Sequence, residues 1–257
     1  MSQGPALKKT YMANPFYMRA VEIIIPFHGK QSRVARLLGE VFSTVATNRY
    51  LVTLVDDGSK NDQFLKQLQE KKIQGVRFLR NDRQSGFGAA VNLALRNPPA
   101  QDIPFVCVLH SDVRLETTNW LINLGRSLLQ MKGEGVKMVC PKTDNPLSEN
   151  QQLVSDGDTR TASETLKSGF IPMYCFLANR ELFSKVGLIA EAPYAGAEAE
   201  EYCIRMKSKG YLQGVCGDSW VRHEGEGTMS DYRNDKKAQE MLRKAREHYG
   251  LLPTSAV

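Results

Sequence analysis

The chain has 257 residues, of which 42% are hydrophobic and 24% charged, with a formal net charge of +6. This composition is that of a globular protein able to bury a core without disulfides or structural metal, and it excludes disordered, collagen-like and coiled-coil chains. The apolar runs, such as VEIIIPF and FVCVL, are far shorter than the roughly 18 residues of a spanning helix, which excludes an integral membrane protein. No secretory signal is visible, so we expect a cytoplasmic protein.

The cysteines indicate the redox state of the protein, and the charge distribution indicates the kind of ligand that it could bind. The five cysteines are odd in number, form no CxxC pair and lie among apolar neighbours, so we expect reduced, buried thiols. Residues 66–83 hold six bases and two acids, whereas every charged residue between Lys185 and Arg205 is an acid. A basic zone and an acidic zone suit an enzyme that holds a polyanion with a metal or proton acceptor, although two solvated faces are the more common origin of such clusters.

The first half alternates short β-branched runs with amphipathic stretches, which predicts βα units around a mainly parallel sheet. We expect strands at 21–25, 50–55, 75–80, 103–110 and 136–140, and helices at 31–46, 61–71, 86–96 and 117–131. Ligands of open α/β sheets bind at the carboxyl ends of the strands. The polar sequences that follow the first four strands are therefore where a site is expected.

The second half is less regular. Residues 142–169 read as a long loop or a pair of short strands, and loops of that length tend to be functional. We expect a strand running into a helix at 175–187, a helix at 198–209, a strand at 211–216 and a final helix at 231–248. The final helix mixes bases with acids, so we expect it to pack on the domain or on a second subunit, which would give a homodimer, rather than to bind membranes.

Two polar segments follow the second and third strands. Asp56 and Asp57 could accept hydrogen bonds from a nucleobase or ribose, although capping of the next helix explains Asp57 equally well. In NDRQSGFGAAVN, Gly86 lets the backbone approach a ligand closely, and Arg80 and Arg83 lie nearby to meet a phosphate. Packing of a helix on the sheet is the alternative explanation of the small residues.

The segment His110-Ser111-Asp112 ends the fourth strand, and among the polar segments it is the most informative about a possible metal site. Side chains two residues apart on a strand share a face, so His110 and Asp112 can both face one cleft. Asp112 offers the hard oxygen that a divalent cation bridging to a diphosphate needs, and His110 could support it. The alternative is a polar strand end with Asp112 capping the next helix.

Four segments, in this order and spacing, resemble family 2 glycosyltransferases of the GT-A fold: VEIIIPFHGK, VTLVDDGSKND, RFLRNDRQSGFGAAVNLAL and FVCVLHSDVRL. The resemblance covers residues 20–145 strongly and 175–225 more loosely. It implies an α/β fold of GT-A type, with a mainly parallel nucleotide-binding sheet flanked by helices and a C-terminal acceptor-side half. It also implies a nucleotide-sugar site formed by Pro26, His28, Asp56, Asp57, Arg80, Arg83, Gly86 and Ser111.

The metal motif departs from the family pattern. Where the family's DxD motif chelates manganese or magnesium, His110 replaces the first Asp and Asp112 matches the second. A softer histidine ligand shifts the preference from magnesium toward manganese. His223, in SWVRHEGEGT, resembles the family's third metal position. The resemblance thus implies Mn²⁺ or Mg²⁺ as the cofactor.

The segment GAEAEEYCIRMKSKGY resembles the family's acidic helix but departs from it at the position of the base. Alignment on Arg205 places Glu198 at the first acid and Ala199 where the base is expected. Glu200 or Glu198 could reach the acceptor hydroxyl after a one-residue shift, and the sequence does not choose between them. A solvated acidic first turn, favoured by the helix dipole, is the alternative.

The resemblance implies an inverting, metal-dependent glycosyltransferase that moves a sugar from a nucleotide-diphosphate sugar to an acceptor hydroxyl. On this interpretation 1–19 is an N-terminal extension and 20–257 a single domain. In that domain 20–145 bind the nucleotide sugar, 146–230 form the acceptor and catalytic half, and 231–257 are a C-terminal helix and tail. The acceptor stays open among a glycan, a lipid-linked sugar, a protein and a nucleic acid, and the basic stretch permits one that bears phosphates.

Two other functions stay open. Ala199 and His110 favour a non-catalytic, glycosyltransferase-like module that binds a nucleotide or glycan. A sugar nucleotidyltransferase ranks lower because it needs a basic, glycine-rich loop after the first strand, and PFHGKQSR has a single glycine.

Overall fold

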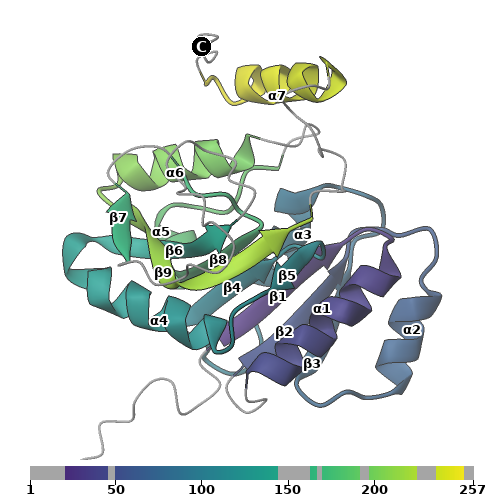
Figure 1. Ribbon diagram of the computed structural model, residues 1–257. Helices are drawn as coiled ribbons and strands as arrows, with labels where there is room; N and C mark the ends of the chain where they lie inside the picture. Colours follow the sequence, from purple (N-terminus) through teal and green to yellow (C-terminus); the bar gives the residue numbers. More distant parts are fainter. Residues whose placement is uncertain are drawn as a thin grey trace, which may run out of the picture.

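A nine-stranded sheet runs through the molecule in the order β3-β2-β1-β4-β8-β6-β9-β5, with β7 paired to β9 outside this path (Figure 1). The structure is a computed structural model, which describes residues 21–45, 50–143, 163–166, 170–191, 197–224 and 236–251. The strands are β1 (Val21–Phe27), β2 (Tyr50–Asp56), β3 (Val76–Arg80), β4 (Phe105–Leu109), β5 (Val113–Leu115), β6 (Val136–Thr143), β7 (Glu164–Leu166), β8 (Cys175–Asn179) and β9 (Leu212–His223). The helices are α1 (Gln31–Thr44), α2 (Gln63–Glu70), α3 (Phe87–Arg96), α4 (Trp120–Gln130), the 3₁₀ helix η2 (Met131–Glu134), α5 (Glu181–Lys185), α6 (Glu198–Ser208) and α7 (Lys236–His248).

The first four βα units agree with the predicted pattern. Strands β3, β2, β1 and β4 are mutually parallel, and every residue of β1 and β4 is buried. Strands covered on both faces read as continuous apolar runs, which is why these two stand out in the sequence. Their carboxyl ends meet at one edge of the sheet, where the polar segments follow.

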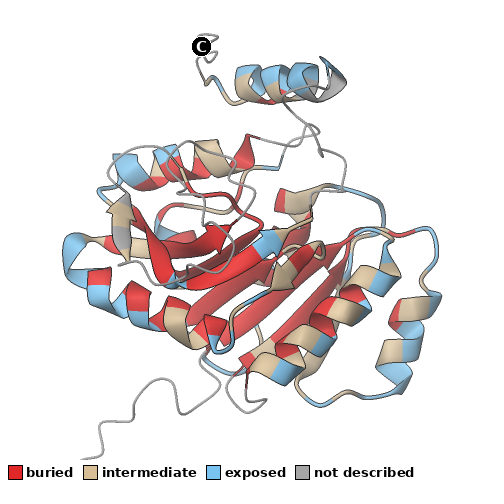
Figure 2. Ribbon diagram, viewed as in Figure 1, coloured by how far each residue is buried: buried red, intermediate tan, exposed pale blue. Residues whose placement is uncertain are grey.

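Helices cover both faces of the sheet and form two hydrophobic cores. One core joins the apolar stripes of α1 and α4 to the sheet, and the other joins α3, α5 and α6 to the opposite face. Figure 2 shows the central strands β1, β4 and β8 almost entirely buried, while the edge strand β3 is only partly buried and the helices are buried along their inner sides. This is the layered packing expected when each helix buries one apolar stripe.

The second half of the sheet is mixed in direction. Strand β8 lies antiparallel between β4 and β6, β6 and β9 are parallel, and β5 and β7 are antiparallel to β9. The strand predicted at 211–216 extends to His223, because the ladder skips residues 217–219 and resumes where Lys142 pairs with Trp220. That irregularity bends β9 and carries its end to β5, a strand that the sequence did not predict.

The five cysteines are free and buried, as predicted. Four of them lie on the neighbouring strands β4, β8, β6 and β9, and Cys203 lies on α6. Burial raises the pKa of Cys203 to about 12 and raises the pKa of Cys107 and Cys175 further. The thiols of Cys107, Cys175 and Cys203 are therefore protonated and unreactive in the folded protein.

The last helix, α7, lies beyond α6, away from the sheet (Figure 1). It begins at Lys236, and residues 231–235 of the predicted helix lie outside the described part of the chain. Ala245 of α7 is fully buried, and Arg246 lies 2.7 Å from Glu200 of α6. The helix therefore packs on the domain, while the predicted homodimer stays a prediction. In the described part of the chain, no helix has the length and apolar character needed to cross a bilayer.

Candidate functional site

The loops that follow β1 and β2 are joined by hydrogen bonds. The backbone N–H of Gly29 donates to the hydroxyl of Ser59 at 2.7 Å, and Nδ1 of His28 lies 2.8 Å from the carbonyl oxygen of Asp57. Pro26 is buried near the end of β1, whereas His28 is exposed. The first two predicted nucleotide-binding segments thus form one surface at the carboxyl edge of the sheet.

Asp57 fixes the loop before α3. Its carboxylate accepts hydrogen bonds from the backbone N–H groups of Ser85 and Gly86 at 2.9 and 2.8 Å, and from the side-chain amide of Asn81 at 2.8 Å. The residue is only 4% exposed. Asp57 therefore holds the glycine-containing loop rather than capping α2.

Asp56 is likewise held by the protein. Its carboxylate accepts the backbone N–H of Ser59 at 2.9 Å and forms an ion pair with Arg80, whose other terminal nitrogen donates to the carbonyl of Ser59 at 2.7 Å. Asp56 is 1% exposed, whereas Arg83 is exposed. The structure brings the predicted residues together, and direct contact of Asp56, Asp57 and Arg80 with a nucleotide stays a prediction.

Three side chains from distant parts of the chain meet beside this surface. Single ligand atoms of His110, Asp112 and His223 all lie within 4.8 Å of one another. His110 follows β4, Asp112 precedes β5 and His223 ends β9, with Ser111 half-buried between the first two. Oδ1 of Asp112 is 3.3 Å from Nε2 of His223 and 3.8 Å from Nδ1 of His110. This group could hold a divalent metal.

The protonation states suit metal ligation. Burial lowers the pKa of His110 to about 4, against an opposing effect of Asp112, so the imidazole is neutral near pH 7. Burial alone would raise the pKa of Asp112, but the close contact with His223 and the proximity of both imidazoles hold this pKa well below its ordinary value. A neutral imidazole and an ionised carboxylate are the forms that bind metals.

Two aromatic rings pack on the histidines, and the sequence did not single out either one. The ring of Tyr174 stacks on that of His223 at 4.1 Å between centroids and an angle of 10°. The ring of Phe87 lies 4.6 Å from that of His110, whose backbone N–H donates to the carbonyl of Tyr174 at 2.8 Å. Only the position of Phe87 between the glycines of GFG hinted at a role. The rings restrict the orientation of the two imidazoles.

The acidic first turn of α6 is engaged in ion pairs. Glu200 pairs with Arg246 at 2.7 Å, and Glu201 pairs with Arg205, which also donates to the backbone carbonyls before α6. Burial raises the pKa of Glu200, and Arg246 opposes that effect. Glu198 is buried at the start of the helix. Both candidate bases thus lie in the same helical turn, and one already has a cation beside it.

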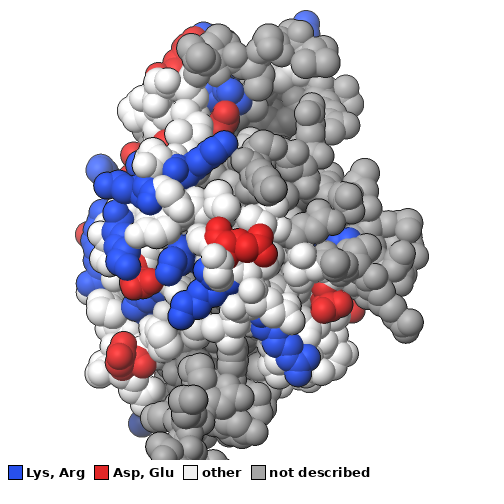
Figure 3. Space-filling view, turned by 90° about the vertical axis from the view of Figure 1, so that its left-hand side faces the viewer, with Lys and Arg blue, Asp and Glu red and all other residues white. Residues whose placement is uncertain are grey.

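Several charged residues of the two zones form ion pairs with oppositely charged residues elsewhere in the fold. In the basic zone, Arg77 pairs with Glu22 and Lys66 with Asp62, while in the acidic zone Glu191 pairs with Arg96. Basic side chains gather instead on the face at the left of Figure 1, where α4 and α6 end (Figure 3). Helix C-termini favour bases, and the last turns of η2, α5 and α6 carry Lys132, Lys185 and Lys207.

Comparison with known proteins gives one family and several similar folds. The model of the family described as "Glycosyl transferase family 2" matches residues 22–187, a range that contains His110 and Asp112 but not His223 or α6. No curated protein sequence matches the chain.

Three solved structures share the fold. They are GalNAc-T7 with UDP, GalNAc and Mn²⁺ (TM-score 0.64, 16% identity, 93% of this chain and 52% of that chain), the mannosyltransferase PcManGT from Pyrobaculum calidifontis with GDP-Man and Mn²⁺ (0.62, 15%, 83% and 59%), and S. aureus TarS 1–349 with UDP-GlcNAc (0.60, 16%, 87% and 64%). This chain thus spans between about half and two thirds of their lengths. At these identities the likeness is one of fold, and the predicted α/β fold of GT-A type is confirmed.

Proposed function

The chain belongs to glycosyl transferase family 2, and from this premise we propose that it is an inverting, metal-dependent glycosyltransferase that uses a nucleotide-diphosphate sugar. The observation that carries the proposal is the convergence of His110, Asp112 and His223 at the carboxyl edge of the sheet. Ligands of α/β sheets bind at this edge. The site would then lie beside the loops that follow β1, β2 and β3.

The donor atoms fit a divalent cation. Two imidazoles and one carboxylate form a mixed nitrogen and oxygen ligand set. Mg²⁺ prefers oxygen ligands alone, so this set suits Mn²⁺ better than Mg²⁺. Two of the three structures named above contain Mn²⁺, which supports the same choice. When bound, such a cation neutralises the charge that develops on a leaving diphosphate.

The loops after β1, β2 and β3 would form the nucleotide pocket. The similar proteins hold UDP, GDP-Man and UDP-GlcNAc, which supports a nucleotide in the corresponding place here. Asp56 and Asp57 already bind groups of the protein, so we assign them to the walls of the pocket. Exposed His28 and Arg83, with Gly86 and Ser111, would contact the donor.

A carboxylate of the first turn of α6 would act as the base. Glu198 or Glu200 would accept the proton of the acceptor hydroxyl while its oxygen bonds to the anomeric carbon and the bond to the diphosphate breaks on the opposite face. The raised pKa of Glu200 favours proton acceptance, whereas its ion pair with Arg246 opposes it. Glu198→Gln and Glu200→Gln assign the base, because only the loss of the base lowers kcat with donor binding intact.

Calorimetric titration of nucleoside diphosphates tests the donor site directly. We expect one of them to bind in the presence of Mn²⁺, and we expect Asp112→Asn to weaken that binding by at least about tenfold. Asp102→Asn, an exposed position before β4, is the matched control and should bind as the wild type does. Failure of every nucleotide to bind with or without Mn²⁺ would overturn the proposal.

The chemical step needs a second measurement. Release of a nucleoside diphosphate from a donor sugar, followed by mass spectrometry, identifies transfer, and the anomeric configuration of the product by NMR tests inversion. A retained configuration would contradict the inverting mechanism alone. Nucleotide binding without turnover on any acceptor would instead favour a non-catalytic binding module.

A further inference from the structure

Four charged side chains form a closed ring of ion pairs between α1, β5 and the end of β9. Arg36 lies 2.7 Å from Glu224 and 3.4 Å from Glu40, and Arg114 lies 2.7 Å from Glu40 and 3.4 Å from Glu224. Each arginine thus contacts both glutamates, and the ring is neutral as a whole. We call these four residues the ion-pair ring.

The ring also binds the backbone on either side of it. Glu40 accepts the N–H of Leu115 at 2.9 Å, and Arg36 donates to the carbonyl of Val113 at 3.2 Å. The N–H of Glu224 donates to the carbonyl of Asp112 at 3.1 Å. Both end residues of β5, and Glu224 after His223, are therefore bonded to side chains of α1.

The three candidate ligands differ in how firmly the sheet holds them, and the ring lies beside the two that are held less firmly. His110 follows β4, an inner strand that pairs with β1 and β8. Asp112 and His223 lie on an edge ribbon, in which β5 has three residues and pairs with β9 alone among the described strands. Val113 is the register partner of His223. Two of the three ligands thus depend on how this ribbon is held.

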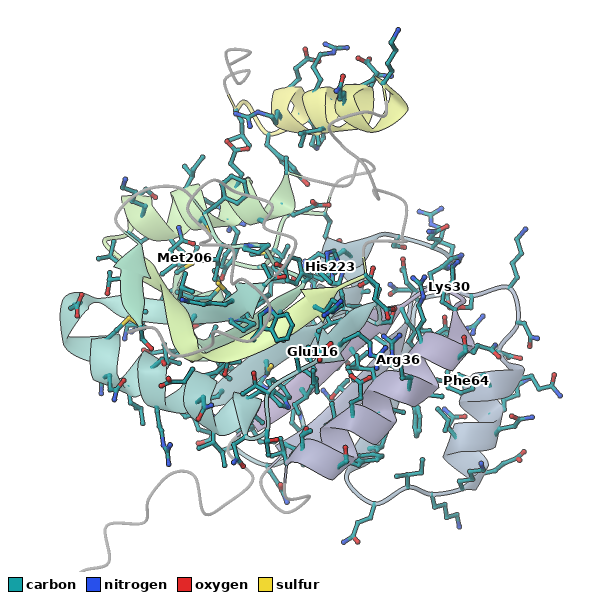
Figure 4. The ribbon with its side chains drawn as sticks, in the orientation of Figure 1. Lys30, Arg36, Phe64, Glu116, Met206 and His223 are labelled. Atoms are coloured by element: carbon teal, nitrogen blue, oxygen red, sulfur yellow. The ribbon has the colours of Figure 1, made fainter. Side chains whose placement is uncertain are left out.

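We propose that the ion-pair ring positions Asp112 and His223 for the cation, with Arg36 and Glu224 as its key positioning residues. The inference rests on the proposed function, since it concerns the same metal group. Arg36 and His223, both labelled in Figure 4, lie where α1 approaches the end of β9. The ring fixes the ribbon against α1, which in turn packs on the sheet that carries His110.

The surroundings make the ring stronger than isolated surface ion pairs. Its side chains are 19–41% exposed, and each carboxylate accepts from two or more donors. Networks of this kind stabilise a fixed geometry more than single exposed pairs do, because solvent screens the single pairs. Outer groups that orient metal ligands typically change metal affinity by about 10–100-fold when removed.

Titration of the nucleotide-free protein with Mn²⁺ by calorimetry tests the proposal, with the bound ion counted by electron paramagnetic resonance. We expect Glu224→Gln to weaken Mn²⁺ binding by about tenfold, and Arg36→Met to do the same. Arg36→Lys should be intermediate, because an ammonium group lacks the planar fork that contacts Glu224 and Val113 together. The double variant should resemble the single ones if both act through the ring.

Glu181→Gln is the matched control, since Glu181 also accepts from two cations, Lys137 and Lys185, but lies away from the metal group. It should leave Mn²⁺ affinity unchanged. Glu224→Gln binding Mn²⁺ within twofold of the wild type, with thermal unfolding showing that it is folded, would overturn the role of the ring. If the wild-type protein itself binds no Mn²⁺, the metal role in the proposed function fails first, and the positioning role with it.

Discussion

Gly58, directly after the two buried aspartates, occupies a position that accepts no side chain. Its φ is +66°, and a Cβ there would lie 2.2 Å from the backbone carbon of Arg83. We expect Gly58→Ala to destabilise the protein by at least about 2 kcal/mol and to weaken nucleotide binding, because the loops after β2 and β3 must move apart. Urea unfolding and nucleotide titration measure the two effects.

The control for Gly58 lies in α1. Gly39 is exposed within the helix, and a Cβ there would meet nothing within 4 Å. Gly39→Ala should be neutral or should stabilise by about 0.5–1 kcal/mol. Equal destabilisation by both substitutions would show that close contact at Gly58 is not the cause.

Single residues also show where the sequence was insufficient. Asp57 was expected either to bind a nucleotide or to cap a helix; it binds the loop before α3 and does not cap α2, while contact with a nucleotide stays a prediction. The neighbours of a carboxylate that follows a strand depend on which loops the fold brings beside it. The same limit applies to the charge zones, because Arg77 and Glu22 are distant in sequence but in contact in space.

At the scale of elements, α7 is held to α6 by a half-buried ion pair. The side chains of Arg246 and Glu200 are 13% and 16% exposed. We expect Arg246→Ala to lower stability by about 1–2 kcal/mol, because it leaves the partly buried carboxylate without its cation. Limited chymotrypsin digestion should then release the C-terminal segment faster than in the wild type.

Arg243 provides the comparison on the same helix. It pairs only with Glu240 and Glu247 of α7 among the described residues, and its side chain is 52% exposed. Arg243→Ala should leave the digestion rate unchanged. If both variants are digested at the same rate, the contact with Glu200 does not hold α7 in place.

Elements with local patterns could be predicted, whereas those that depend on distant partners could not. The βα units up to β4 follow from periodicity, since each strand and helix buries a face that its own residues define. Strand β5 has three residues and exists because the bent end of β9 pairs with it. His223 could be matched to a metal position by resemblance, but its contact with Asp112 required the fold.

For the whole molecule, an ion triad around a buried glutamate joins strands at the sheet edge opposite the candidate site. Glu22 of β1 is fully buried and pairs with Arg77 of β3 and with Arg180, which follows β8. Glu22→Gln leaves two guanidinium groups without their carboxylate, so we expect a loss of about 3 kcal/mol in the free energy of unfolding. The KM for the donor should not change.

Asp62→Asn is the control for this loss. Asp62 pairs with Lys66 on the surface, where both side chains are more than 40% exposed, so its loss should leave the free energy of unfolding nearly unchanged. Urea unfolding compares the two variants. A cost for Glu22→Gln no larger than that for Asp62→Asn would show that the triad contributes little to stability.

Labelling of the buried cysteines would report local unfolding of the strands that carry them. A thiol reagent should modify the native protein only as fast as individual segments expose their sulfur atoms. Because Cys107, Cys175, Cys140 and Cys216 lie on four neighbouring strands, the order in which they are labelled gives the order in which the centre of the sheet separates. Ligand-induced protection could then be followed strand by strand without any added probe.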